Sequence, residues 1–95
     1  MKLVGVKTLH DYQKQHTDVA SQVDSWVQEA KAATWSKPHD IKRRYSSADF
    51  FKNNHIVINL KGNKYRLLFQ VNYLLGIVVV KKIGTHSEYD RWKLE

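Results

Sequence analysis

The 95-residue sequence contains no cysteine, one proline and four glycines. Without cysteine the chain can form neither a disulfide framework nor a thiolate metal site, which excludes zinc fingers and cysteine nucleophiles. With so little proline and glycine, collagen-like and linker-like chains are excluded as well. The length is enough for one small domain and too little for two, so we expect residues 1–95 to form a single domain.

The chain also lacks a long hydrophobic run. No window approaches the roughly 20 apolar residues that cross a bilayer, and residues 1–7 contain no apolar stretch of the kind found in signal peptides. The longest apolar run, residues 73–80, suits a buried strand instead. We therefore expect a cytoplasmic protein that has no membrane partner.

Acidic residues are few compared with basic ones. Sixteen Lys and Arg against nine Asp and Glu give a formal net charge of +7. An excess of this size on a small domain favours an anionic partner, which can be RNA, DNA, an acidic protein or an anionic membrane surface. Composition alone leaves open the alternative that the charge serves only solubility.

The first third of the chain predicts a strand followed by two helices. Residues 3–6 are a short β-branched segment typical of an edge strand, and residues 8–16 have helical spacing. A second helix, capped by Thr17 or Asp18, is indicated by one apolar stripe at helical period: Val19, Val23, Trp26, Val27 and Ala30. It is expected to run to about Trp35, where residues 36–38, which end in Pro38, stop it.

The residues after Pro38 are expected to connect the helices to a sheet. Residues 39–45 are interpreted as a polar connection that carries a basic run. Ser46 or Ser47 is then expected to cap one further helical turn, which holds Phe50 and Phe51.

From residue 55 onwards the apolar period changes from 3.6 to 2. Residues 55–60, 65–72 and 76–83 are predicted to be three strands of an antiparallel meander. Residues 85–94 are expected to form a short closing helix with Tyr89 and Trp92 on one side. The sequence thus predicts an α+β fold, in which a short N-terminal strand and two helices pack on one face of the meander.

The hairpin between the first two of these strands has a readable register. If Gly62 and Asn63 form a two-residue loop, one face carries only apolar pairs: Leu60 with Tyr65, Ile58 with Leu67, and Ile56 with Phe69. The other face places Lys61 opposite Lys64 and Asn59 opposite Arg66. Like charges directly opposite each other are destabilising unless an anion lies between them. Lys61 and Lys64 flank a turn, so the alternative is a solvated hairpin in which water screens them. An unpaired arginine in the middle of a sheet is also costly, so Arg66 is our main candidate for a functional residue.

The topology brings further polar residues to Arg66. The third strand returns antiparallel to the second, so Lys82 lies near Arg66 and the residues after this strand leave at the same end of the sheet. These include His86, Tyr89 and Asp90. Cations beside an imidazole and a phenol suit phosphodiester chemistry, because they can neutralise charge at phosphorus and move protons.

Two motifs make the sequence recognisable. Residues 59–68, NLKGNKYRLL, and residues 85–90, THSEYD, resemble the HigB toxins of the RelE-like group, and the resemblance covers most of the chain. It implies an mRNA interferase, which cuts messenger RNA on translating ribosomes without a metal or other cofactor. It also implies a cognate HigA-like helix-turn-helix antitoxin, and operator DNA as a partner only of the toxin–antitoxin complex.

The resemblance also bears on single residues. Arg66 matches the strand arginine of the RelE-like group, and Tyr89 matches its C-terminal tyrosine. Val57 and Asn59 stand where some relatives carry lysine, which leaves more of the proton transfer to His86.

We expect the ribose 2′-hydroxyl to attack the adjacent phosphate, which leaves a 2′,3′-cyclic phosphate. Arg66, Lys61 and Lys64 are expected to hold the phosphate. His86 is the first candidate for general base or acid, since histidine titrates near physiological pH, and Tyr89 is either a second proton-transfer group or a stacking platform.

The remaining predicted site residues bind substrate or support the chemistry. Asp90 is expected to orient His86 or to pair with Arg66, for which Glu88 is the other possible partner. Asn59 and Lys82 are expected to contact the RNA. Arg43, between two further basic residues, is expected either to follow the RNA backbone or to belong to a solvated basic loop. No metal site is predicted, because the five histidines show no ligand spacing.

Three other functions remain open from the residues alone. A non-catalytic RNA- or ribosome-binding module would share the basic sheet without needing His86 and Tyr89. A DNA-binding regulator is disfavoured, because no helix carries base-reading residues in helix-turn-helix order. A purely structural partner-binding domain would not arrest growth when expressed alone.

Overall fold

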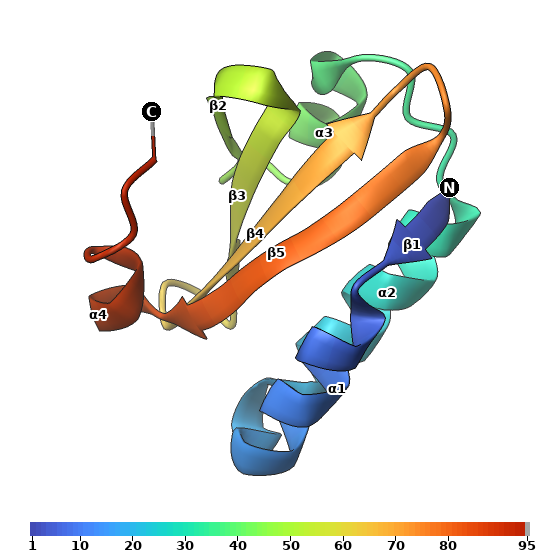
Figure 1. The fold of residues 1–95 in the computed structure, drawn as a ribbon. Helices are drawn as coiled ribbons and strands as arrows, with labels where there is room; N and C mark the ends of the chain where they lie inside the picture. The colour runs from blue at the N-terminus through green and yellow to red at the C-terminus, as the bar shows by residue number, and fades with distance from the viewer. Residues whose placement is uncertain (95) are drawn as a thin grey trace.

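The computed structural model describes residues 1–94, which form a five-stranded sheet with its longer helices on one face (Figure 1). The elements in chain order are β1 (Lys2–Val4), α1 (Val6–Gln15), the 3₁₀ turn η1 (Thr17–Val19), α2 (Ala20–Ala32), α3 (Pro38–Arg44), β2 (Asp49–Phe51), the 3₁₀ turn η2 (Lys52–Asn54), β3 (His55–Leu60), β4 (Tyr65–Asn72), β5 (Ile77–Thr85) and α4 (His86–Tyr89). The predicted α+β class is confirmed. In the described part of the chain, no helix is long and apolar enough to cross a membrane.

The sheet has the strand order β1-β5-β4-β3-β2. Strands β2 to β5 pair antiparallel, whereas β1 pairs parallel to β5 at one edge. The predicted meander therefore forms the centre of the sheet, and each edge gains one short strand.

The predicted hairpin register is confirmed in all three apolar pairs and in the pairing of Asn59 with Arg66. The connecting turn differs from the expectation. Positive φ falls on Lys61 (50°) and Gly62 (64°) rather than on Gly62 and Asn63. Lys61 and Lys64 close the turn through a 3.2 Å bond from the Lys64 N–H to the Lys61 carbonyl.

The polar connection predicted over residues 39–45 is wrong, because residues 38–44 form helix α3. Pro38 occupies the first turn of this helix, where its missing N–H costs nothing, so it begins a helix as well as following one. The Asp40 carboxylate accepts bonds from the Ser36 N–H at 3.0 Å and from its hydroxyl at 3.1 Å. The Ser36 N–H bond lowers the pKa of that carboxyl.

Three other segments differ from the sequence expectation. The helical turn predicted around Phe50 and Phe51 is wrong, since both residues lie on β2 and pair with β3. The closing helix predicted over residues 85–94 is wrong beyond Tyr89, where α4 ends. The apolar run 73–80 enters a strand only at Ile77, and Leu74 is 93% exposed in the preceding turn.

The core lies between the helices and one face of the sheet. Its centre is the aromatic contact of Trp26 on α2 with Phe69 on β4, whose ring centroids are 5.0 Å apart, and Trp35 stacks on Phe69 from 6.2 Å. The predicted helical stripe is buried here in full: Val19, Val23, Trp26, Val27 and Ala30. This face is therefore filled, which leaves the opposite, outer face of the sheet for a functional site.

A bulge in β5 changes which of its side chains reach the outer face. Leu68 pairs with Lys82 and Phe69 pairs with Val80, so Lys81 is the extra residue. Val78 and Val80 pack into the core before the bulge, and Ile83 does so after it. The bulge thus reverses the alternation, and Lys82 and Gly84 share the outer face with Arg66.

Candidate active site

Arg66 is a buried charged residue, only 8% exposed, on the outer face of β4 near the hairpin turn. Its Nη1 donates to the carbonyl oxygens of Asn63, at 2.7 Å, and Tyr65, at 3.2 Å. Its Nη2 donates to Nδ1 of His86 at 3.1 Å. Two carbonyls and a neutral ring nitrogen solvate the guanidinium without cancelling its charge.

The expected carboxylate partner of Arg66 is absent from the described residues. Neither Glu88 nor Asp90 forms an ion pair with it within residues 1–94. The Glu88 carboxylate instead accepts a 2.8 Å bond from the Thr85 N–H, and the Thr85 hydroxyl accepts one from the Glu88 N–H, which makes a capping box for α4. The Thr85 N–H bond lowers the pKa of Glu88.

His86 is exposed and stands at the start of α4, next to the guanidinium. Its backbone N–H donates to the carbonyl oxygen of Lys64 at 2.9 Å, which ties the helix to the hairpin turn. Because an arginine side chain can only donate hydrogen bonds, Nδ1 of His86 must be the acceptor. The imidazole therefore carries its proton on Nε2 in this arrangement.

Tyr89 and Trp92 complete the site from the C-terminal side. The Tyr89 ring lies over Arg66, with its centroid 5.5 Å from Cζ, and meets the Trp92 ring edge to face. Trp92 lies against Gly84, where an added Cβ would be 3.1 Å from Cζ2 of the indole. Lys82 lies beside the same indole, with Nζ 5.8 Å from the ring centroid.

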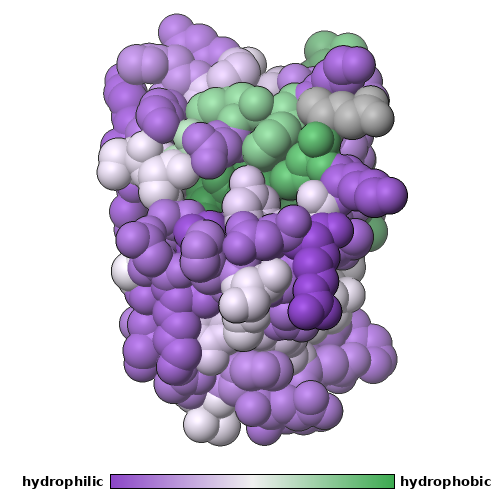
Figure 2. Space-filling model, turned by 90° about the vertical axis from the view of Figure 1, so that its left-hand side faces the viewer, coloured by the Kyte–Doolittle hydropathy of each residue, from purple (hydrophilic) through white to green (hydrophobic). Residues whose placement is uncertain are grey.

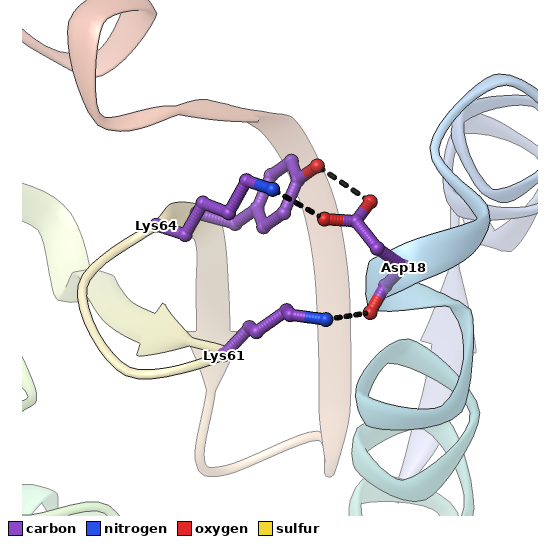
Figure 3. A network of polar contacts seen from close by, with 4 residues as sticks. Asp18, Lys61 and Lys64 are labelled. Atoms are coloured by element: carbon purple, nitrogen blue, oxygen red, sulfur yellow. Dashed lines mark hydrogen bonds and ion pairs between the residues drawn. The ribbon is translucent and has the colours of Figure 1, made fainter.

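Lys61 and Lys64 contact Asp18 instead of the guanidinium site (Figure 3). Nζ of Lys61 donates to the Asp18 carbonyl at 3.0 Å, and Nζ of Lys64 donates to its Oδ2 at 2.7 Å. Within residues 1–94, neither ammonium group contacts Arg66, His86 or Tyr89. Asp18 thus supplies its carboxylate to Lys64 and its main-chain carbonyl to Lys61.

The predicted cap of the second helix by Thr17 or Asp18 is wrong, and the Asp18 carboxylate instead forms hydrogen bonds across the molecule. Its Oδ1 accepts a 2.7 Å bond from the Tyr65 hydroxyl, and no side chain in the described residues caps α2. The Lys64 and Tyr65 hydrogen bonds lower the pKa of Asp18 to about 2. The same carboxylate raises the pKa of Lys64 and of Tyr65.

Asn59 and Asp90 lie close to the site. Asn59 stands opposite Arg66, as predicted, and its Nδ2 donates to Oδ1 of Asn63 at 2.8 Å. Asp90 is exposed, and its backbone N–H donates to the carbonyl of His86 at 3.2 Å. In the described part of the chain its carboxylate contacts neither His86 nor Arg66.

The basic run on α3 is engaged elsewhere except for Arg43. Arg44 pairs with Glu29 at 2.6 Å, and Lys42 donates to the carbonyls of Ser46 and Ala48. Arg43 is exposed and, within the range the structure describes, contacts no side chain of the Arg66 site.

A cavity of about 390 Å³ opens on the outer face next to the site. Its lining includes the apolar side chains of Phe51, Leu68 and Leu94 and the basic side chains of Lys81 and Lys82. Leu68 and Lys82 pair with each other on neighbouring strands. Viewed from the side of the C-terminal segment, Figure 2 shows an apolar patch enclosed by hydrophilic residues.

The described chain offers no candidate set of metal ligands. No group of three or more His, Asp or Glu side chains in residues 1–94 is arranged to hold a metal ion.

Two residues that shape the site were not predicted to do so. Asp18 accepts a hydrogen bond from Lys64, which is 46 residues away in the sequence, and no local pattern indicates a contact at that separation. Gly84 carried a usable signal, since a glycine inside a strand often marks the close approach of another group, here the Trp92 indole.

Known proteins similar to this chain match it over almost its full length. A family model described as HigB_toxin, RelE-like toxic component of a toxin-antitoxin system, matches residues 19–92. The mRNA interferase toxin HigB of Escherichia coli K12 is 26% identical over 92 residues, which is 95% of this chain and 88% of the relative. The mRNA interferase HigB of Escherichia coli O6:H1, strain CFT073, is 24% identical over 93 residues, 96% of this chain and 90% of the relative.

Proposed function

Because the chain belongs to the HigB family, the RelE-like toxic components of toxin-antitoxin systems, we propose that it is an mRNA interferase, an endoribonuclease that cleaves messenger RNA. One observation carries the proposal. A buried arginine without a carboxylate partner in the described chain, Arg66, contacts both an exposed imidazole, His86, and a tyrosine ring, Tyr89. This arrangement puts a phosphate-binding charge beside two groups that can move protons.

The guanidinium of Arg66 binds the scissile phosphate. Its fork of N–H donors matches phosphate oxygens, and its burial strengthens its interaction with the charge that develops on them. An arriving phosphate competes with His86 for Nη2, since a charged acceptor is stronger than a neutral ring nitrogen. Binding of RNA therefore frees Nδ1 of His86 next to the reacting atoms.

Cleavage then proceeds within the RNA. The ribose 2′-oxygen attacks phosphorus, its proton passes to His86 acting as general base, and the bond from phosphorus to the 5′-oxygen breaks. The leaving oxygen takes up a proton, for which Tyr89 is the candidate donor, with stacking of a base as its other role. The products are a 2′,3′-cyclic phosphate and a 5′-hydroxyl.

The rest of the message lies along the outer face. The cavity beside Leu68 has an apolar lining and lysines around it, which suits a nucleotide with its base inward and its phosphates outward. Lys82 and Asn59 contact the RNA next to the scissile bond, and Arg43 follows its backbone further away. Asp90 orients His86 once Arg66 has turned to the phosphate.

The two hairpin lysines take a different part from the one expected. In the free protein Lys64 pairs with the Asp18 carboxylate and Lys61 donates to the Asp18 carbonyl, so their direct contribution is to hold the turn beside the site. A direct contact of Lys61 with the phosphate requires it to leave the Asp18 carbonyl.

Membership of the family supports extending the proposal to the partners. The substrate is mRNA on the translating ribosome in the cytoplasm, and a cognate HigA-like helix-turn-helix antitoxin neutralises the toxin. Operator DNA is bound only by the toxin–antitoxin complex. Arg66 supplies the charge at phosphorus, so the proposed step requires no metal or other cofactor.

The test is expression of the chain without an antitoxin, followed by primer extension on a translated reporter mRNA. We expect growth arrest and new 5′ ends within the reading frame, both lost in His86→Ala. Purified protein added to translating ribosomes should release mRNA fragments with 2′,3′-cyclic phosphate ends. Growth arrest by wild type and His86→Ala alike, without new 5′ ends, would favour the non-catalytic ribosome-binding module.

A further inference from the structure

Asp18 connects the helical layer to the hairpin turn through three contacts. Its carboxylate accepts from the Lys64 ammonium and the Tyr65 hydroxyl, both at 2.7 Å, and its carbonyl accepts from the Lys61 ammonium at 3.0 Å. The side chain of Asp18 is 33% exposed, so these contacts are partly shielded from water. A single acidic residue thus gathers three polar groups around the turn.

Two of these partners also touch the active site with their main chains. Lys64 is bonded to Asp18 by its side chain, and its carbonyl accepts the backbone N–H of His86 at 2.9 Å. Tyr65 is bonded to Asp18 by its hydroxyl, and its carbonyl accepts Nη1 of Arg66 at 3.2 Å. Each of the two residues therefore joins Asp18 to one member of the Arg66–His86 pair.

The Tyr65 ring has little freedom to move away from Asp18. Tyr65 is 3% exposed and faces the Tyr12 ring edge to face, with centroids 6.1 Å apart. The His16 ring approaches it in the same way from 6.0 Å and stacks on Tyr12. This packing holds the Tyr65 hydroxyl against the Asp18 carboxylate.

We propose that Asp18 is a positioning residue of the active site, which sets the geometry of Arg66 and His86 through the carbonyls of Lys64 and Tyr65 without touching the RNA. The inference rests on the proposed function for its kinetic part. The structural part of the inference, that the Arg66–His86 hydrogen bond depends on Asp18, is independent of the proposed function.

The structural part is tested by NMR of the imidazole nitrogens in Asp18→Asn, with Asp11→Asn as the matched control. Asp11 is also an acid paired with a lysine, Lys7, at 2.8 Å. At a pH where imidazoles are neutral, we expect wild type and Asp11→Asn to hold His86 in the tautomer protonated on Nε2. In Asp18→Asn the His86 nitrogen shifts should move towards those of a mixed-tautomer imidazole. Unchanged shifts would overturn the proposal.

The kinetic part is tested by single-turnover cleavage of mRNA well below the unfolding temperature. We expect Asp18→Asn to lower the cleavage rate by about 10- to 100-fold, the range that a displacement of about 1 Å can cause. RNA affinity should change by less than about threefold, because the lost interaction acts on the transition state. Asp11→Asn should match wild type.

A double-mutant cycle separates positioning from loss of stability. Tyr65→Phe removes one of the two routes, so it should lower the rate by less than Asp18→Asn does, and the double variant should lose less than the product of both. The proposal would be overturned if the rate losses of the two single variants simply multiply in the double variant. It would also be overturned if the rate of each variant falls only in proportion to its folded fraction. A wild-type protein that cleaves no RNA would refute the nuclease function, and the NMR comparison would still decide the role of Asp18.

Discussion

Nη2 of Arg66 donates a 3.1 Å hydrogen bond to Nδ1 of His86, so a buried cation is joined directly to an exposed imidazole. In the free protein this bond fixes the histidine tautomer and solvates the guanidinium. The same bond keeps Nδ1 occupied until an anion takes over the guanidinium. The pair thus links binding of a phosphate to the availability of a base.

Arg66→Ala should lower the RNA cleavage rate by about 10²- to 10³-fold, since it removes a charge that stabilises the transition state. Arg66→Lys should recover only part of the rate, because an ammonium lacks the planar fork. Cleavage of labelled mRNA and growth after induction measure both variants. Circular dichroism melts serve as the control for folding, and a folded Arg66→Ala that still arrests growth and cleaves RNA contradicts the assignment.

Substitutions at Tyr89 separate proton transfer from stacking. Tyr89→Phe keeps the ring that lies 5.5 Å from Arg66 and from Trp92 but loses the hydroxyl. If Tyr89 donates a proton, Tyr89→Phe should lose as much activity as Tyr89→Ala, whereas a stacking platform predicts that Tyr89→Phe stays within about threefold of wild type. Because proton transfer contributes about 10²- to 10⁴-fold, single-turnover rates distinguish the two roles.

Gly84→Ala should displace the C-terminal segment from the sheet. The new Cβ would be 3.1 Å from Cζ2 of Trp92 and 3.2 Å from Cβ of Glu88, both closer than ordinary contacts. We expect a loss of about 1–3 kcal/mol in the free energy of unfolding and reduced cleavage. In a Trp92→Ala background the same substitution should cost less, as urea unfolding would measure. An equal cost in both backgrounds would show that the indole is not the obstacle.

The Asp18 carboxylate predicts a specific dependence of stability on pH. Its pKa is about 2 in the folded protein, below the ordinary 3.8, because of its bonds to Lys64 and Tyr65. A depressed carboxyl pKa adds stability above the unfolded value, and this stability is lost as the pH falls through the folded value. The difference in unfolding free energy between wild type and Asp18→Asn should therefore be largest above pH 3.8 and shrink towards pH 2. Urea titrations across this range measure it, and a difference that stays constant refutes the prediction.

The central hairpin and the place of Arg66 could be predicted because both depend on local alternation. Strict period-2 pairing fixed the facing residues of β3 and β4, and antiparallel return then brought His86 and Tyr89 to Arg66. Such arguments need only strand length and direction.

The elements that were predicted wrongly contain residues that are compatible with two different local structures. Pro38 can end one helix or begin another, and the sequence alone favoured the ending. Phe50 and Phe51 suit a helical turn or an edge strand equally, and pairing with β3 decides between them. The contact of Asp18 with Lys64 depends on how the helices lie on the sheet, which no local pattern encodes.

The extra residue at Lys81 limits where the chain can change in length. Since the bulge reverses the alternation of β5, deleting the residue between Val80 and Lys82 would turn Lys82, Gly84 and everything after them to the opposite face. The functional side chains that follow β5 would then face the helical layer instead of the outer face. Changes of length in homologous chains should therefore accumulate in the turn after β4 and avoid the stretch from the bulge to His86.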